Sequence, residues 1–308
     1  KEALSTIGRA LPEGRVALPI LGHILLVTEG PGTLRLSATN LDMSIHCWIG
    51  GEFDRPLAIA VPGRTFIDLI NTIPPGPVDL QQADRLNLIV SAGRSRSTLH
   101  GMDAADFPPL PDLPESVAAL PLSLSLEGAI REVAFAAATD EARPTLKGIL
   151  IQSDGTNITL AAADGYRLAV RQGLPGARAP FSVILPLRAA TEWARVCARM
   201  GAKYEDPPDA EIRLSPDSNR IFLQIKSPED ATPSVRVLVV SSLIPGKFPD
   251  YEQLIPRYRE TGFAIDAPVL GNALKTATVF ARESENFPVT IAGTKSGVDI
   301  MASSWMGD

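Results

Sequence analysis

The chain has 308 residues, a formal net charge of −6 and a pI near 5.3. This length predicts two or three domains rather than a single core. The acidic balance argues against tight, static binding of nucleic acid, although it is compatible with a local basic face. Two cysteines, Cys47 and Cys197, form no disulfide framework and favour a reducing, cytoplasmic location. The sequence contains neither a stretch of membrane-spanning length nor a secretory pattern.

Five helices are predicted from apolar residues that recur every three or four positions. They are expected over residues 1–11, 63–73, 125–137, 186–200 and 266–280. In the first, Leu4, Ile7 and Leu11 fall on one face, which should be buried. Ser125 and Asp266 stand at positions where a helix N-cap is favoured, before the third and fifth helices.

Alternating apolar and polar residues predict antiparallel strands between these helices. They fall in segments 18–43, 78–99, 120–126, 143–168, 211–243 and 287–308. Two proline-rich segments, 107–114 and 244–257, separate the resulting units. We therefore expect an α+β fold with tandem similar domains, each with two helices packed on antiparallel β-sheet. The expected domains are 1–116, 117–256 and 257–308, the third incomplete because the pattern stops before its second helix.

An internal repeat supports this division. Residues 18–43 and 143–168 align so that Pro19 matches Pro144, Leu25 matches Leu150 and Leu36 matches Leu160. Asn40 then falls on Asp164, and a weaker third copy covers residues 287–308. The period is far longer than that of a solenoid repeat, so it indicates similar domains in tandem.

No catalytic or metal-binding motif emerges from the sequence. His23, His46 and His100 lack metal-ligand spacing, the cysteines form no pair, and no nucleophile or phosphate-binding loop motif is found. We therefore expect no cofactor. Asp164 and Asp250 are the first suspects for acid–base chemistry, but Asp164-Gly165 is more simply read as a turn. This absence favours a binding protein over an enzyme.

Positive charges recur on the predicted helices. Arg188, Arg195 and Arg199 fall on one face of the fourth helix, and Lys203 follows it. The other candidates are Arg64 on the second helix and two loop arginines that precede the repeated strands, Arg15 and Arg143. Taken alone, such residues are more often a solvated helix face. Their repetition favours a surface that holds nucleic acid by its phosphates, without reading bases.

Several motifs in order resemble the bacterial DNA polymerase III beta subunit, the sliding-clamp family. They are LPILGHILL, VPGRTFIDLI, SAGRSRSTLHGMDAADFPPL, AADGYRLAV and IPGKFPDYEQLIP, which are spread over nearly the whole chain. The resemblance implies the DNA clamp fold, in which two chains join head to tail into a ring. Helices line the hole around duplex DNA, and sheets form the outside.

The resemblance also implies a pocket for short hydrophobic peptides of DNA polymerases, the clamp loader and repair proteins. Carried over residue by residue, its expected lining is Leu146, Ala163, Gly165, Tyr166, Arg167, Leu168, Pro249, Gln253 and Leu254. Tyr166, Ala163 and Gln253 depart from the family patterns, which implies a different peptide preference. Pro144 and Thr145 replace an aromatic pair beside Arg143, which implies weaker loop contacts with DNA.

Ring closure in the family pairs the first domain of one chain with the third domain of another. Arg94, Arg96 and Leu99 are expected on the first side of this interface, and Val279 and Phe280 on the second. The expected partners are therefore double-stranded DNA, a second copy of the chain, the polymerase and the clamp loader, with no membrane.

Two other functions remain open at this point. The first is a clamp-like scaffold that binds proteins without encircling DNA. The second is an acidic, β-rich hydrolase that uses Asp164 and Asp250.

Overall fold

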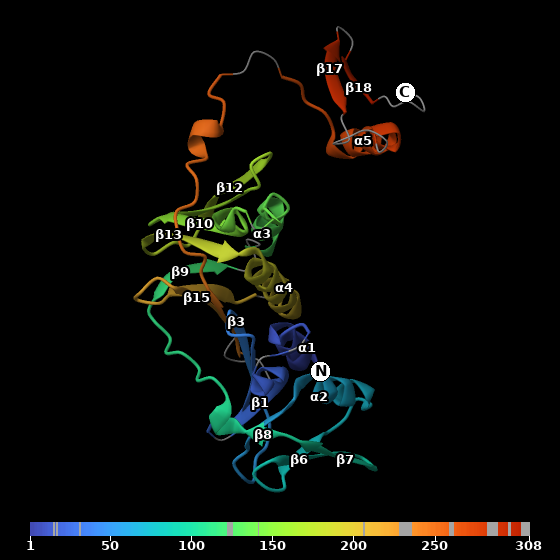
Figure 1. Ribbon diagram of the computed structural model, residues 1–308, viewed down its shortest axis with the longest axis vertical. Helices are drawn as coiled ribbons and strands as arrows, with labels where there is room; N and C mark the ends of the chain where they lie inside the picture. The colour runs from blue at the N-terminus through green and yellow to red at the C-terminus, as the bar shows by residue number, and fades with distance from the viewer. Residues whose placement is uncertain are drawn as a thin grey trace. The chain divides into compact units, whose positions relative to one another are not determined.

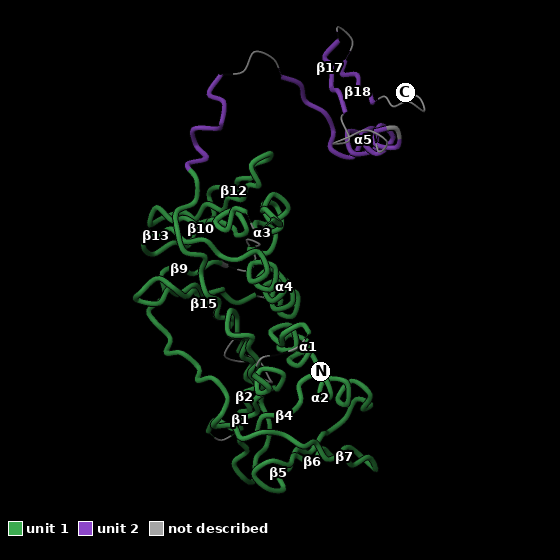
Figure 2. Tube along the Cα trace, in the orientation of Figure 1, with its two compact units in different colours: residues 1–249 green, residues 250–308 purple. Residues whose placement is uncertain are grey.

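The computed structural model describes residues 1–14, 16, 18–30, 32–121, 126–140, 142–205, 207–227, 236–258, 262–281, 289–294 and 297–302, apart from the side chains at positions 121 and 280. The chain forms two compact units, Lys1–Pro249 and Asp250–Asp308 (Figure 2). The first unit contains both copies of the clearest sequence repeat, and the weaker third copy falls in the second unit.

A nine-stranded antiparallel sheet runs through the first unit. Its strands are, in spatial order, β8 (Met102–Asp103), β4 (Ala58–Pro62), β1 (His23–Thr28), β2 (Thr33–Thr39), β3 (Met43–Gly50), β16 (Arg236–Ser242), β15 (Arg220–Lys226), β14 (Asp209–Leu214) and β9 (Ser116–Pro121). The two repeats, each taken from here with its flanking helices and strands, meet where β3 pairs with β16. Ile45 lies opposite Val239 in this pairing. The backbone hydrogen bonds of the sheet therefore continue across the junction between the repeats.

The described part of the first unit also contains two smaller antiparallel sheets. One has the order β5 (Asp79–Gln82), β6 (Asn87–Ala92) and β7 (Ser95–His100). The other has the order β12 (Leu168–Pro175), β11 (Asn157–Ala163), β10 (Gly148–Asp154) and β13 (Pro180–Pro186). The β1–β2 hairpin pairs Leu25 with Ser37, and the β10–β11 hairpin pairs Leu150 with Ala161 at the equivalent register. This agreement confirms the alignment of the two repeats.

Among the described residues of the first unit, four α-helices lie along one side (Figure 1). They are α1 (Glu2–Ile7), α2 (Gly63–Thr72), α3 (Leu126–Ala134) and α4 (Leu187–Lys203). The predicted inward faces are confirmed, because Leu4, Phe66 and Trp193 are all buried. The first helix is shorter than expected, since it tightens into a 3-10 turn, η1, over Gly8–Ala10. Leu126, predicted to end a strand, instead begins α3, and Leu122, Leu124 and Ser125 lie outside the described residues.

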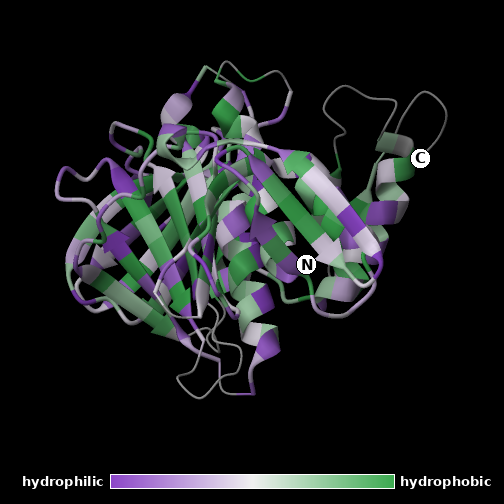
Figure 3. Ribbon diagram, turned by 90° about the horizontal axis from the view of Figure 1, so that it is seen from below, coloured by the Kyte–Doolittle hydropathy of each residue, from purple (hydrophilic) through white to green (hydrophobic). Residues whose placement is uncertain are grey.

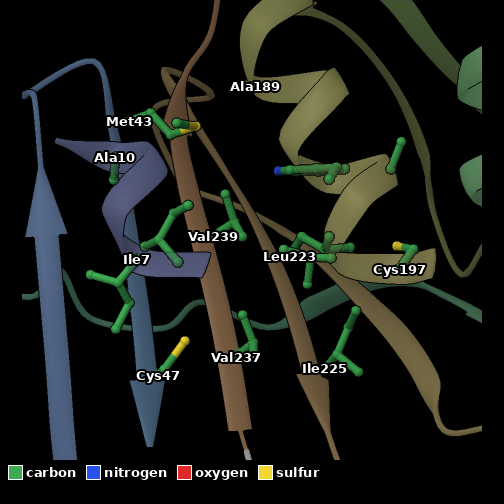
Figure 4. Close-up of a cluster of buried hydrophobic side chains, with 14 of the residues drawn as sticks. Ile7, Ala10, Met43, Cys47, Ala189, Cys197, Leu223, Ile225, Val237 and Val239 are labelled. Carbon is green, nitrogen blue, oxygen red and sulfur yellow. The ribbon is translucent and has the colours of Figure 1, made fainter. Parts of the chain in front are cut away.

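The core of the first unit lies between these helices and all three sheets, since it includes residues of the nine-stranded sheet and of both smaller sheets. Figure 4 shows Ile7 of α1 and Cys197 of α4 on the same side of the sheet as Val237 and Val239 of β16. Burying a large apolar side chain of this kind contributes about 1.5–3 kcal/mol. Burial also raises the pKa of the thiols of Cys47 and Cys197 to about 12, so both stay protonated at neutral pH. Figure 3, coloured by hydropathy, shows apolar and polar positions mixed along the strands.

The second unit contains a short 3-10 turn, η6 (Glu252–Leu254), one α-helix and one hairpin among its described residues. The helix is α5 (Ala267–Ala281), and the hairpin joins β17 (Thr290–Thr294) to β18 (Gly297–Met301). Asp266 caps α5 as predicted, because its carboxylate accepts the backbone N–H of Val269 at 3.4 Å. Of the predicted inward face, Ala277 is buried and Leu270 is half-buried.

Candidate functional site

The predicted cations of α4 lie at the seam where α4 meets α1 and η1, and several of them are engaged there. Arg199 donates to the backbone carbonyl of Glu2 at 3.1 Å and to the hydroxyl of the buried Thr6. These contacts join residues almost two hundred positions apart in the sequence. Arg199 therefore ties the two repeats together as well as lining the helical face.

A buried carboxylate lies at the centre of this seam. Glu192 of α4 has a side chain only 7% exposed, and it forms an ion pair with Arg9 of η1 over 3.6 Å. The same carboxylate accepts a hydrogen bond from Arg195, whose side chain is 51% exposed. Burial of a carboxylate is unfavourable unless cations surround it, so Glu192 needs these arginines.

Two further ion pairs cross the seam at exposed positions. Arg188 lies 3.7 Å from the carboxylate of Glu13, and Lys203 lies 3.6 Å from that of Glu2. Surface pairs of this kind are worth about 0–1 kcal/mol each. The five cations at the seam thus face three carboxylates, which leaves a formal excess of two positive charges. The helical face is only moderately positive here.

The remaining predicted DNA-facing residues divide into three cases. Arg64 is exposed in the first turn of α2, where it donates to the carbonyl of Pro12 at 3.2 Å. Arg15 lies outside the described residues. Arg143 is exposed, and it donates to the carbonyl of Asp164 in its own repeat at 3.0 Å. Arg143 therefore contacts the turn that the resemblance assigns to peptide binding.

This turn connects β11 to β12 and is organised by Asp164. Its carboxylate accepts the backbone N–H groups of Tyr166 and Arg167 at 2.9 and 3.0 Å. It also forms an ion pair with the Arg167 side chain at 2.9 Å. The backbone N–H groups, followed by the Arg167 side chain, hold the pKa of the Asp164 carboxyl below its usual value of 3.8. Asp164 thus shapes the turn through a carboxylate that stays ionised.

Glycine is favoured at the next position, Gly165, by the backbone angle. Its φ angle is +90°, in the left-handed region that side chains rarely adopt. A Cβ atom there would also lie 1.9 Å from an Nη atom of Arg143, so the end of this flexible side chain would have to move. The following residue, Tyr166, is 94% exposed, so its ring is available to a partner.

Sequence reasoning missed Phe135 beside this turn. Phe135 follows α3 and is 60% exposed, and the Arg167 guanidinium lies 5.7 Å from the centre of its ring. Such an arrangement is a cation–π contact, worth about 0.5–1 kcal/mol at an exposed site. Its helical position alone indicated no role, because the contact depends on how α3 packs against β12.

The other predicted pocket residues lie in both units. In the first unit, Leu146 is buried, Ala163 and Leu168 are half-buried and Pro249 is exposed. In the second unit, Leu254 is 70% exposed, and the Gln253 amide donates to the carboxylate of Asp250 at 2.6 Å.

The residues predicted for the first side of the subunit interface lie on or beside β7. This strand is at the edge of its sheet, because it pairs only with β6 among the described residues. Arg94 and Arg96 are exposed there. Leu99 is buried in the core of its own unit, so it presents little surface to a partner. In the second unit Val279 is 59% exposed, while the side chain of Phe280 lies outside the described residues.

The described residues contain no cluster of three or more His, Cys, Asp or Glu side chains able to hold a metal ion. His46 is buried between the hydroxyls of Ser37 and Ser44, and burial, aided by Arg35, lowers its pKa to about 3. It therefore stays neutral. None of the helices in the described part of the chain combines the length and apolar character needed to cross a membrane.

Comparisons with known proteins agree with this architecture. Residues 2–111 match the family described as "DNA polymerase III beta subunit, N-terminal domain", and residues 123–250 match its "central domain". The beta sliding clamp of Escherichia coli K12 is 30% identical over 272 residues, covering 88% of this chain and 69% of the relative. That of Synechococcus elongatus is 32% identical over 292 residues, covering 92% and 72%.

Solved structures of the same family also superpose on this chain. The beta subunit of Streptococcus pyogenes DNA polymerase gives a TM-score of 0.87 at 25% identity, covering 100% of this chain and 79% of that one. The sliding clamp of Pseudomonas aeruginosa bound to griselimycin gives 0.84 at 26% identity, with the same coverage. The chain therefore belongs to the DNA polymerase III beta subunit family, the non-catalytic sliding clamps of bacterial DNA replication.

Proposed function

We propose that two copies of this chain close head to tail into a ring around duplex DNA, in the cytoplasm, and tether the replicative polymerase to its template. The observation that carries this proposal is the placement of α1, α2, α3 and α4 along one side of the first unit, in which one sheet continues through both repeats (Figure 1). Such a body presents a long helical face to DNA. Membership in a non-catalytic family removes the hydrolase alternative.

The charge of the helical face suits sliding. Arg188, Arg195, Arg199 and Lys203 have partners within the protein, and the seam keeps a small positive excess. Contacts with phosphates are then weak and independent of sequence, so the ring moves along the duplex without a large barrier. A closed ring is retained by topology, and tight contacts are unnecessary.

Tethering explains processivity. A polymerase that dissociates from the primer end but stays bound to the ring is held at a high effective concentration. We assign its attachment, and that of the clamp loader, to the turn at Asp164–Leu168. Tyr166, which precedes Arg167 in the chain, and Phe135, which contacts the Arg167 guanidinium, provide exposed aromatic surface. Exposed aromatic residues grouped with an arginine are typical of binding hot spots.

Ring closure is assigned to the exposed edge of β7. An edge strand carries unpaired backbone groups, which a strand of another chain can complete. Arg94 and Arg96 then supply charge at the rim of the interface. Since Leu99 is buried, we expect its replacement to act through the stability of the fold rather than through direct subunit contact.

The decisive experiment measures topology. Labelled protein is loaded onto nicked circular DNA with a clamp loader and ATP, and its retention in high salt is followed before and after the circle is cut once. Retention on circles with release from linear DNA is expected. Equal retention on both forms would contradict encirclement. Loss from both forms, with a loader shown to be active on its own clamp, would favour the protein-binding scaffold.

A second experiment tests whether the seam keeps DNA contacts weak. Replacing Glu192 with Gln removes the carboxylate shared by Arg9 and Arg195, so both become available to phosphates. We expect tighter binding to short linear duplex and a steeper dependence of affinity on salt. Glu205→Gln, at an exposed position just after α4, makes the same change in net charge and is the control. Equal effects of the two variants would contradict a specific role for the seam.

A further inference from the structure

A cavity of about 90 Å³ lies at the junction between the two repeats of the first unit. Its lining comes from the β2–β3 hairpin, the linker that follows η3 (Ala104–Asp106), and strands β15 and β16. The lining residues are Thr39, Leu41, Asp42, Ser44, His46, Phe107, Pro108, Pro109, Pro111, Arg220, Val240 and Ser242. Figure 1 shows this linker crossing the side of the unit opposite to the helices. The cavity is therefore separate from the helical face.

The rim of the cavity carries an apolar side chain in an unfavourable backbone conformation. Leu41 is 58% exposed and has a φ angle of +77°, where a leucine is strained. Local hydrogen bonds hold the turn around it. The Asn40 amide oxygen accepts the N–H of Met43 at 2.8 Å, and the Thr39 hydroxyl accepts the N–H of Leu41 at 3.0 Å. The fold thus maintains a strained, exposed leucine at the mouth of a cavity.

The polar groups of the lining are largely satisfied within the protein. The Thr39 hydroxyl donates to the carbonyl of Met43 at 3.1 Å, and the Ser44 hydroxyl bonds to His46 at 2.9 Å. His46 stays neutral because it is buried. Together with Phe107, Val240 and the prolines, these groups form a surface that favours an apolar group over a charged one.

One cation of the lining has no side-chain partner among the described residues. Arg220 is exposed at the start of β15, and its guanidinium makes no ion pair or hydrogen bond with the described residues. Asp42 lies in the same lining, and its carbonyl accepts the N–H of Ser242 at 2.8 Å. Arg220 therefore offers a free binding partner to a carboxylate placed next to an apolar group.

The second repeat contains a turn of the same construction. Asn40 and Asp164 are equivalent in the repeat, and each accepts a backbone N–H from the residue three positions later. Each turn includes one residue with positive φ, Leu41 in the first and Gly165 in the second. Each repeat is also followed by a Phe-Pro pair in its linker, Phe107-Pro108 and Phe248-Pro249. The turn and linker beside the cavity, after the first repeat, are thus the structural counterparts of the turn and linker of the second repeat.

We propose that the cavity at the first junction binds an extended peptide, with a leucine-sized side chain inside and a neighbouring carboxylate on Arg220. The volume fits one side chain of this size, and the exposed side chain of Leu41 would cover the peptide from the rim. The site is separate from the turn at Asp164–Leu168, and it does not depend on that turn binding peptides.

The test uses a synthetic probe, acetyl-photoleucine-aspartate-leucine amide. After irradiation with the protein, mass spectrometry locates the cross-links. Cross-links in segments 39–46 and 107–111 are expected. Cross-links confined to residues 163–168 and 244–249, or scattered over the surface, would overturn the proposal. Cross-links confined to residues 163–168 and 244–249 would still be consistent with the sliding-clamp function.

Three variants test the assigned contacts. Arg220→Gln should reduce labelling of the cavity about fivefold, the effect of one exposed ion pair. The matched control is Arg178→Gln, an exposed arginine outside the lining. Leu41→Gly should also reduce labelling, and glycine tolerates the backbone angle of this turn. The probe with asparagine in place of aspartate should label the wild type weakly and Arg220→Gln no differently. Labelling that is indifferent to Arg220 and Leu41 would refute the assignment.

Discussion

The two turns at the repeat junctions use the same hydrogen-bonding plan with different residues. In the first, the neutral amide of Asn40 accepts one backbone N–H, and Leu41 takes the positive φ angle. In the second, the carboxylate of Asp164 accepts two N–H groups, and Gly165 takes the positive φ angle. The difference teaches that one backbone turn can be kept either by tolerating strain or by removing the side chain that causes it.

Arg143 adds a second constraint to the second turn, because its side chain would have to move to admit a residue like Leu41. Its guanidinium occupies the space that a side chain at Gly165 would need. The hydrogen bond of Arg143 to the Asp164 carbonyl then holds the turn from outside. The second turn is therefore more tightly constrained, and it presents Tyr166 to solvent.

The largest expected effect is that of Gly165→Ala. The new methyl group would meet Arg143 and would also occupy a positive φ angle, so we expect the free energy of unfolding to fall by about 1–3 kcal/mol. Chemical denaturation would measure this loss. In an Arg143→Gln background the clash is relieved, so the loss should be smaller. An equal loss in both backgrounds would show that the contact with Arg143 is unimportant.

At position 41, glycine and alanine should differ less in the free energy of unfolding than they do at position 165. Leu41→Gly and Leu41→Ala both remove the side chain, but only glycine relieves the φ angle of +77°. We expect the glycine variant to be more stable by about 1 kcal/mol, measured by chemical denaturation. A more stable alanine variant would mean that this turn is not strained.

Arg143→Gln alone should lower the free energy of unfolding by about 0.5–1 kcal/mol, because one exposed hydrogen bond to the turn is lost. Arg178→Gln, at an exposed position outside this turn, removes the same charge and is the control for the denaturation experiment. Equal stability of the two variants would argue that the second turn holds its shape without Arg143.

The smallest expected effect is a loss of stability of the second turn when Asp164 is protonated in acid. The pKa of Asp164 in the folded protein lies below the usual 3.8, so its stabilising contribution is complete above that value and is lost as the pH falls through the lower, folded pKa. Amide NMR signals of Tyr166 and Arg167 should therefore shift in this acid range. The amide signal of Met43, bonded to the uncharged Asn40, should not follow the same titration. Parallel shifts at both turns would indicate general acid unfolding.

Much of the local structure could be read directly from the residues. The spacing of Phe66 and Ile70, and that of Trp193 and Cys197, predicted the buried faces of α2 and α4, because a helix repeats every 3.6 residues. The aligned repeats predicted equivalent hairpins, and the strand registers confirm them. Such features depend on neighbours close in sequence, so local patterns contain them.

Contacts between distant segments were decided only by the tertiary structure. Three such contacts join elements that lie far apart in the sequence. They are the pairing of β3 with β16, the hydrogen bonds of Arg199 to α1 and the contact of Arg167 with Phe135. The sequence showed that Arg188, Arg195 and Arg199 share a helical face, but not that carboxylates and carbonyl groups of the other repeat would meet them. The physical reason is that side-chain periodicity determines which face an element buries, whereas its partner depends on the packing of the whole core.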